Sequence, residues 1–267
     1  MLKNITFGQF YPADSFIHHL DPRIKIILTV AMVVLVFMGV FMIDYILIFL
    51  FFILCARLSS VPLKLLIKGL KPLRFILLLT FVLNLCFSQG DKLIVDLSFV
   101  KITEEGFVLA VRYSLRLMFL VIATSYMTLT TSPISLADGI EMLLSPLKII
   151  RFPAHEFAMM MTITLRFIPT LLEETDKIMK AQMARGADFE SGNILKRAKA
   201  MVPLMVPLFV SAFKRATELA MAMESRCYHG GINRTRLRTL TITKNDLYAC
   251  LSVAALISIK LFMNMMI

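Results

Sequence analysis

FVLAVRYSLRLMFLVIATSYMTLTT, residues 107–131, is the stretch that decides the fold. It carries only two charged residues, Arg112 and Arg116, and it exceeds the roughly 20 residues with which an α-helix spans a bilayer. Further apolar runs, each bounded by charged residues or by Pro and Gly, occupy residues 24–41, 42–56, 75–88 and 245–267. We therefore predict an all-α membrane protein with about five transmembrane helices.

The composition of the 267-residue chain supports this prediction. Hydrophobic residues make up 58% of it and the mean hydropathy is +0.78, whereas soluble domains contain about 45–50% apolar residues. The first apolar run is not a typical cleavable signal, because it begins after 23 residues, lacks a small-residue cleavage site and is followed at once by the second run. Most of the surface should face lipid or a partner.

The net charge of +11 follows from where the basic residues lie, and it does not indicate nucleic-acid binding. Lys and Arg gather before the first run, between the second and third runs, and in residues 132–246, which hold sixteen of them. The link near Ile43 has none, and the loop at 89–106 has more acidic than basic residues. By the positive-inside rule, five crossings of a bacterial cell membrane would leave the N-terminus cytoplasmic and the C-terminus extracellular.

No metal or cofactor is expected. The histidines have no metal-ligand spacing. The cysteines lack CxxC spacing and read as free thiols or small apolar residues: Cys55, Cys86, Cys227 and Cys250.

Two kinds of helix are expected outside the spans. Residues 59–74 predict an amphipathic surface helix, with apolar positions on one face and lysines opposite. After Thr131, residues 132–144 predict a short amphipathic helix, and 154–185 and 194–228 predict two long ones. We divide the chain into a membrane-embedded region with four spans, a cytoplasmic or interfacial coupling region and a final transmembrane helix: 1–131, 132–244 and 245–267.

Polar groups inside the predicted spans need partners, because an unpaired polar group in lipid is costly. Asn84 should hydrogen-bond a neighbouring helix. Arg116 lies deep in its span, and Arg112 can extend toward the surface. We leave two roles open for this arginine pair, an anchor for a partner's helix or pairing within the chain.

The two long helices end alike. The first ends in Ala184, Arg185 and Gly186, and the second in a looser version, Ser225, Arg226 and Cys227. Arginine is favourable at any helix C-terminus, where the backbone carries partial negative charge. The small neighbours and the repetition of the arrangement favour a second reading, in which each arginine inserts into an acidic groove of a partner.

No catalytic or phosphate-binding motif occurs, since GxxxxGK[ST], HExxH and GxSxG are all absent from the sequence. We therefore expect a non-enzymatic membrane protein.

Four stretches carry a resemblance to a known family: PADSFIHHLDPRIK (12–25), TTSP (130–133), PAHEFAMMMTITLRFIPTLLEETDKIMKAQMARGADF (153–189) and ELAMAMESRCYHGGINRTR (218–236). In order and over almost the whole chain, they resemble the transmembrane T component of energy-coupling factor transporters. The resemblance implies a scaffold that joins two ABC-type ATPase subunits, which bind the ATP, to a substrate-binding S component for vitamin or micronutrient import.

The resemblance also implies roles for particular residues. In that family two Ala-Arg-Gly tips dock on the ATPases, and here they correspond to residues 184–186 and 225–227. The second tip departs from the pattern, because Ser and Cys replace Ala and Gly. If several S components are served, flexible methionines suit their exchange, so contacts to an S component or within the chain are expected at Arg112, Arg116, Met159, Met160 and Met161.

Two alternatives stay open. One is the T component of a dedicated cobalt or nickel importer, a close relative in the same family. The other is a stand-alone carrier whose polar site would comprise Asn84, Arg112 and Arg116. Repeated halves with broken helices would favour the carrier, and the sequence shows no such repeat. A membrane-bound enzyme would need a catalytic site that the sequence does not offer. The substrate itself does not follow from the sequence.

Overall fold

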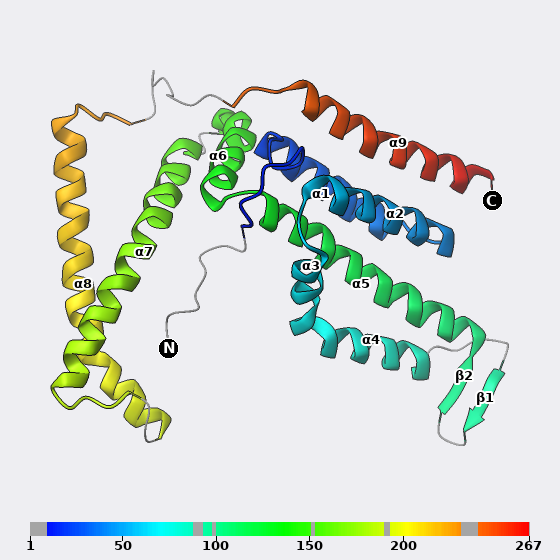
Figure 1. Cartoon of the computed structure of the whole chain (residues 1–267), viewed down its shortest axis with the longest axis horizontal. Coiled ribbons are helices and arrows are strands. Elements are labelled where there is room, and N and C mark those ends of the chain that lie inside the picture. The colour runs from blue at the N-terminus through cyan, green and yellow to red at the C-terminus, as the bar shows by residue number, and fades with distance from the viewer. Residues whose placement is uncertain are drawn as a thin grey trace. The chain divides into compact units, whose positions relative to one another are not determined.

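The computed structural model describes residues 10–87, 93–97, 100–150, 153–189, 193–230 and 240–266. The α-helices are α1 Pro22–Phe37, α2 Met42–Ser59, α3 Leu63–Leu70, α4 Arg74–Phe87, α5 Glu104–Thr130, α6 Pro133–Leu144, α7 Ala154–Ala184, α8 Ile194–Ser225 and α9 Lys244–Met266. Two 3-10 helices, η2 Lys71–Leu73 and η3 Ser145–Ile150, and two strands, β1 Leu93–Leu97 and β2 Val100–Thr103, complete the described elements (Figure 1).

The chain forms two compact units, whose boundary falls inside α6. The bundle unit contains described residues 10–139 and 240–266, and the long-helix unit contains described residues 140–230. The division at 131/132 and 244/245 that the sequence favours stays a prediction.

Helix starts follow from local chemistry. Asp21 precedes α1 and its carboxylate accepts a 2.9 Å hydrogen bond from the Arg23 backbone N–H, while Pro22 occupies the first turn, where it has no N–H to leave unpaired. Thr103 caps α5 in the same way, accepting from the Gly106 N–H at 3.1 Å. α1 therefore begins where the Asp-Pro pair predicts.

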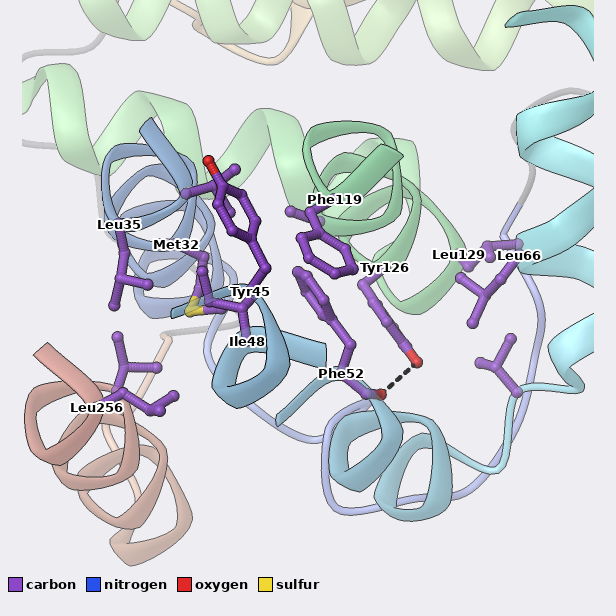
Figure 2. Close-up of a cluster of buried hydrophobic side chains, with 14 residues drawn as sticks. Met32, Leu35, Tyr45, Ile48, Phe52, Leu66, Phe119, Tyr126, Leu129 and Leu256 are labelled. Carbon is purple, nitrogen blue, oxygen red and sulfur yellow. Dashed lines mark hydrogen bonds between the residues drawn. The ribbon is translucent and has the colours of Figure 1, made fainter. Parts of the chain in front are cut away.

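The core of the bundle unit lies where α1, α2, α5 and α9 pack together (Figure 2). Phe52 of α2 stacks on Tyr126 of α5 with ring centroids 6.0 Å apart, and the Tyr126 hydroxyl donates a 3.0 Å hydrogen bond to the Phe52 carbonyl. Phe119 contacts both Tyr45 and Phe52. The aromatic cluster joins α2 to α5, the longest helix of the unit.

Five helical segments are long and apolar enough to cross a membrane: Met42–Ser59, Leu63–Phe87, Glu104–Thr130, Lys199–Ser225 and Lys244–Met265. A helical multi-pass membrane protein is thereby confirmed, although the set differs from the predicted one. The first apolar run forms α1, which at 16 residues is shorter than a usual span. Most of α8, which we had assigned to the coupling region, meets the criterion instead.

The region between α2 and α5 differs from the prediction in two ways. The expected single surface helix over 59–74 is the short helix α3 followed by η2, and Figure 1 shows α3 running across the direction of α2 and α5. It approaches α5 closely at Gly69, where an added Cβ would lie 3.2 Å from Ser125 Oγ. Strands β1 and β2 form an antiparallel hairpin that the all-α prediction did not include.

The long-helix unit is built on α7 and α8, of 31 and 32 residues. At a rise of 1.5 Å per residue, each is about 45–50 Å long. The two helices cross (Figure 1), and the Arg215 guanidinium donates a 3.0 Å hydrogen bond to the Glu174 carboxylate between them. On α8, the half-buried positions near this contact include Ser211, Arg215 and Leu219, whereas Ala216 and Ala220 are exposed.

Candidate functional site

The first tip, residues 184–186, is a helix end closed by its own backbone. The N–H groups of Arg185 and Ala187 both donate to the Gln182 carbonyl at 3.0 Å, and the Gly186 N–H donates to Met183 at 3.0 Å. Gly186 has φ +87°, the left-handed conformation in which glycine avoids a steric penalty. The chain thus turns sharply just after Arg185.

The second tip, residues 225–227, repeats this pattern position for position. The N–H groups of Arg226 and Tyr228 both donate to the Met223 carbonyl, at 3.2 and 3.0 Å, and the Cys227 N–H donates to Glu224 at 2.9 Å. Cys227 takes the place of the glycine with φ +55°. The two tips are therefore the same C-terminal motif, and the second one carries a side chain at its strained position.

Both tip arginines are exposed. Within the described part of the chain, neither the Arg185 nor the Arg226 guanidinium makes a hydrogen bond or an ion pair. Each follows the last helical residue, close to carbonyls that carry partial negative charge. The arrangement leaves two guanidinium forks accessible to acidic or carbonyl groups of another molecule.

The surroundings of the two tips differ. The second tip borders a cleft of about 600 Å³ whose walls come from α7, α8 and the turn after α8: Met159, Ile163, Leu219, Met223 and residues 226–230. For the first tip, a Cβ added at Gly186 would meet nothing within 4 Å. Of the three predicted methionines, Met159 lines this cleft, Met161 is half-buried, and Met160 is exposed and lines no part of the cleft.

The α7–α8 crossing is held by Glu174. Its carboxylate accepts hydrogen bonds from Ser211 and Arg215 of α8, and these bonds lower the pKa of Glu174 against the opposing effect of desolvation. Both partners of the Glu174–Arg215 ion pair remain partly exposed. This polar contact lies between the apolar and charged halves of α7 and joins it to α8.

Arg116 pairs within the chain. Its guanidinium donates a 3.0 Å hydrogen bond to the Gly39 carbonyl just beyond the end of α1, and it lies over the rings of Phe37 and Tyr113 at 5.6 and 5.4 Å from their centroids. Of the two roles left open for this residue, the structure contains the internal one. Arg112 is half-buried, and its Nε has no hydrogen-bond partner in the described part of the chain.

Lys260 of α9 has a similar role that the sequence did not reveal. Its ammonium group is buried and donates a 2.9 Å hydrogen bond to the Leu35 carbonyl in the last turn of α1. Two cations from different helices therefore satisfy carbonyls at the end of α1, where an α-helix leaves them unpaired. Asn84, by contrast, was predicted to bond a neighbouring helix and donates instead to Thr80 of its own helix at 2.7 Å.

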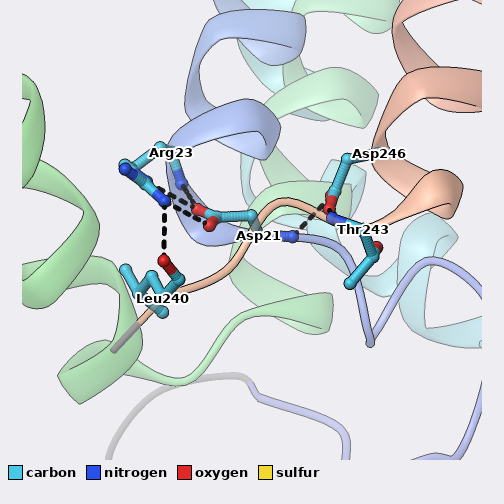
Figure 3. A network of polar contacts seen from close by, with 5 residues as sticks. All are labelled: Asp21, Arg23, Leu240, Thr243 and Asp246. Atoms are coloured by element: carbon cyan, nitrogen blue, oxygen red, sulfur yellow. Dashed lines mark hydrogen bonds and ion pairs between the residues drawn. The ribbon is translucent and has the colours of Figure 1, made fainter. Parts of the chain in front are cut away.

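A polar network joins the starts of α1 and α9 (Figure 3). The Asp21 backbone N–H donates to the Asp246 carboxylate at 2.7 Å, and Arg23 bridges the Asp21 carboxylate, at 2.8 Å, and the Leu240 carbonyl, at 3.1 Å. Burial alone would raise the pKa of Asp21, but the hydrogen bonds from Arg23 outweigh it and the net shift is downward. Asp246 is fully buried and also accepts from the Thr243 N–H.

Sequence reasoning missed Asp246, although a local signal for it exists. Thr243 and Asp246 stand three residues apart before an apolar run, which is the spacing of a capping box. The contact with Asp21, which is 225 residues away in the sequence, has no such signal.

Comparison with known proteins agrees with these features. Residues 13–237 match the family CbiQ, described as cobalt transport protein. The chain is 54% identical over 255 residues to the energy-coupling factor transporter transmembrane protein EcfT of Thermosediminibacter oceani, covering 96% of each chain. It is 53% identical to the EcfT protein of Acidaminococcus fermentans, with 99% and 98% coverage, and 48% identical to that of Bacillus subtilis, with 99% and 100% coverage.

These relatives are named as transmembrane subunits of transporters, and the match extends through the bundle helices and both tips. The chain belongs to the family of energy-coupling factor transporter transmembrane proteins.

Proposed function

We propose that this chain couples two ABC-type ATPase subunits to a substrate-binding S component, and that Arg185 and Arg226 are the points of coupling. The observation that carries the proposal is the repeated C-terminal motif, which exposes one arginine at the end of each long helix. A pair of equivalent tips suits a pair of related receiving subunits. In this proposal the chain is not an enzyme, and the ATPases bind and hydrolyse the ATP.

The physical basis is rigid transmission. A closed helix end fixes the backbone at its arginine, so movement of a groove docked on that arginine would move the helix as a lever. The Glu174–Arg215 contact at the crossing would pass that movement between α7 and α8. Arginine suits the docking because its planar fork binds carboxylates in a fixed orientation.

The S component needs an apolar surface, and α8 offers one. A long stretch of its side chains is exposed in the isolated chain: Met201, Val202, Met205, Val206, Phe209, Val210 and Phe213. Contiguous exposed apolar patches mark membrane or partner contacts. We infer that this face meets the S component at the membrane, and that its methionines allow more than one S component to fit.

The proposed orientation leaves the N-terminus in the cytoplasm and the C-terminus outside. It counts α1 as a span and keeps α8 from crossing the membrane, although α8 is long and apolar enough to do so. Both tips then lie on the cytoplasmic side, where ATP is available. Cysteine scanning with a membrane-impermeant thiol reagent on intact cells tests it. The orientation is wrong if a cysteine added at the C-terminus is protected while one added near the N-terminus reacts.

The cargo is proposed to be a vitamin or a related micronutrient. A second candidate is cobalt or nickel, and the description of the matching family names cobalt. In both cases the S component would select the cargo. Co-purification from the native membrane separates them: several small hydrophobic partners indicate a shared vitamin module, and one constant partner indicates a dedicated importer.

The decisive experiment measures assembly and ATP hydrolysis of the reconstituted complex. Arg185→Glu combined with Arg226→Glu should abolish ATPase association, since each reversed charge would repel the groove that an arginine fits. Arg166→Glu is the matched control, because Arg166 is an exposed arginine of α7 far from its end. If the double variant assembles and couples hydrolysis to uptake as the control does, the tips are not the coupling points.

A further inference from the structure

The bundle unit contains an apolar cavity that the proposed coupling does not use. Its volume is about 280 Å³, and all four core helices α1, α2, α5 and α9 contribute to its lining. The contributing segments run from Lys25 to Met32 in α1 and from Ala123 to Thr130 in α5. Each covers about 10 Å along its helix axis, so the cavity reaches roughly two turns into the bundle.

The position of the cavity is set by the ends of the helices. It lies beside the starts of α1 and α9 and the ends of α2 and α5, and Phe16, Ile17 and Leu20 from the segment before α1 also line it. The cavity therefore lies at the edge of the membrane-spanning bundle that carries the network of Asp21 and Asp246.

The exposed part of the cavity lining comes from α2 and α9. Lining residues from α1 and α5, such as Met32, Ala123 and Tyr126, are buried. Those that are themselves exposed come from the other two helices: Leu54, Leu58, Tyr248 and Ser252. An occupant can thus enter sideways from the bilayer.

Two exposed cations lie next to this exposed lining. Arg57 lies in the last turn of α2, within one turn of both Leu54 and Leu58. Lys244 begins α9 four residues before Tyr248, which places the two side chains on the same face of that helix.

Other charges described at this end have partners. Asp21 and Asp246 are buried in the network described above, and the Lys25 ammonium donates to the carbonyls of His18 and Thr130 at 3.1 and 2.9 Å. The exposed Asp14 carboxylate pairs with His19. Arg57 and Lys244 therefore offer accessible positive charge near the cavity.

We propose that this cavity holds an acyl chain of an anionic phospholipid from the surrounding bilayer, with Arg57 and Lys244 binding its phosphate group. The cavity is apolar, its exposed lining comes from α2 and α9, and Arg57 and Lys244 lie next to that lining at the end of the bundle, where headgroups are expected. Apolar burial then retains the chain, and the two cations select the headgroup.

The absence of tryptophan from the chain makes a direct test available. Phe51→Trp places one fluorophore in the cavity lining, and Leu54→Trp serves as a second reporter should the first variant fail to fold. The full chain is reconstituted in bilayers that contain phosphatidylglycerol or phosphatidylcholine brominated in the acyl chain. Bromine quenches tryptophan at contact, so quenching reports which lipid occupies the site.

At equal mole fractions we expect brominated phosphatidylglycerol to occupy the cavity with a preference of about tenfold or more, because each basic side chain near the membrane surface favours anionic lipid several-fold. Phe262→Trp is the control reporter, since Phe262 is exposed on α9 but does not line the cavity. It should show no such preference.

Three further variants test which part of the site causes the preference. Arg57→Gln with Lys244→Gln should remove the headgroup preference, while Lys64→Gln with Lys68→Gln, which removes two exposed lysines of α3, should keep it. Ala249→Phe should fill the cavity and reduce quenching by both lipids.

Several results would overturn the proposal. Equal quenching by the two lipids in the Phe51→Trp chain would rule out a preference for an anionic headgroup. No quenching by either lipid would mean that something other than lipid fills the cavity. If the α3 lysine variant lost the phosphatidylglycerol preference as well, the preference would come from the general positive charge at the membrane edge and not from Arg57 and Lys244.

Discussion

The two tips share one backbone conformation but differ at two of their three residues, and the difference at the left-handed position shows what the motif requires. Gly186 and Cys227 hold the same left-handed position with the same pattern of hydrogen bonds. A non-glycine residue in this conformation costs about 1–2 kcal/mol. The second tip therefore forms against a local penalty, with an adjoining cleft between α7 and α8 that the first tip does not share.

The largest effect should come from reversing the charge of one tip at a time. Arg185→Glu or Arg226→Glu alone should weaken ATPase binding at least about tenfold, because a reversed charge leaves the groove's own charges unpaired. Titration of the reconstituted complex with each purified ATPase measures this. Equal losses of ATPase binding would mean that the two tips are equivalent. A loss in only one variant would mean that only that tip binds an ATPase.

Exchanging the residues at the left-handed position should have an effect of about 1 kcal/mol in opposite directions. Gly186→Cys should destabilise the first tip, and Cys227→Gly should stabilise the second. Hydrogen exchange of the Ala187 and Tyr228 amides reports the change, since each closes its helix end. If the protection of neither amide changes, backbone strain at this position does not determine the stability of the tips.

A smaller change should follow from removing the cleft wall beside the second tip. Met159→Ala deletes a half-buried side chain that lines the cleft, and we expect it to cost less than about 1 kcal/mol. Exchange should speed up at Tyr228 and stay unchanged at Ala187. Met160→Ala is the matched control, because Met160 is exposed and lines no part of the cleft. An equal change in hydrogen exchange at Ala187 and Tyr228 would mean that the cleft wall does not support the second tip in particular.

The smallest effect concerns the crossing that both tips share. The folded-state pKa of Glu174 is lowered. The ionised carboxylate therefore stabilises the α7–α8 crossing above its ordinary pKa of about 4.3, and this stabilisation is lost as the pH falls through the lowered pKa. The partly exposed pair is worth about 1 kcal/mol or less.

Spin labels on α7 and α8 should therefore report a wider distance distribution in acid than at neutral pH. Glu174→Gln should show the wide distribution at every pH. A pH response that persists in this variant would assign it to another group.

The sequence predicted those features that local chemistry determines. Asp21-Pro22 marked the start of α1, and Gly186 marked the end of α7. The arginine of each tip was recognisable because it precedes a helix-ending turn. The geometry shared by Gly186 and Cys227 was not predictable, since cysteine carries no left-handed preference.

Features that depend on distant parts of the chain were missed for a physical reason. Lys260 and Leu35, like Asp21 and Asp246, are 225 residues apart in the sequence, and only the packing of α9 against α1 brings them together. The length of α1 was overestimated because hydrophobicity continues to Val40, past the point where Arg116 binds the Gly39 carbonyl. Composition reports what can lie in lipid, and hydrogen bonding decides where a helix stops.

The cysteine at the second tip also makes the wild-type chain a ready chemical reporter. All four cysteines are free, and Cys227 alone among them is exposed. A water-soluble maleimide should label it first, next to the arginine proposed to dock, with no substitution needed. The labelling rate would then report attachment and release of an ATPase at the second tip. The first tip, which has glycine at the equivalent position, would not react with the maleimide.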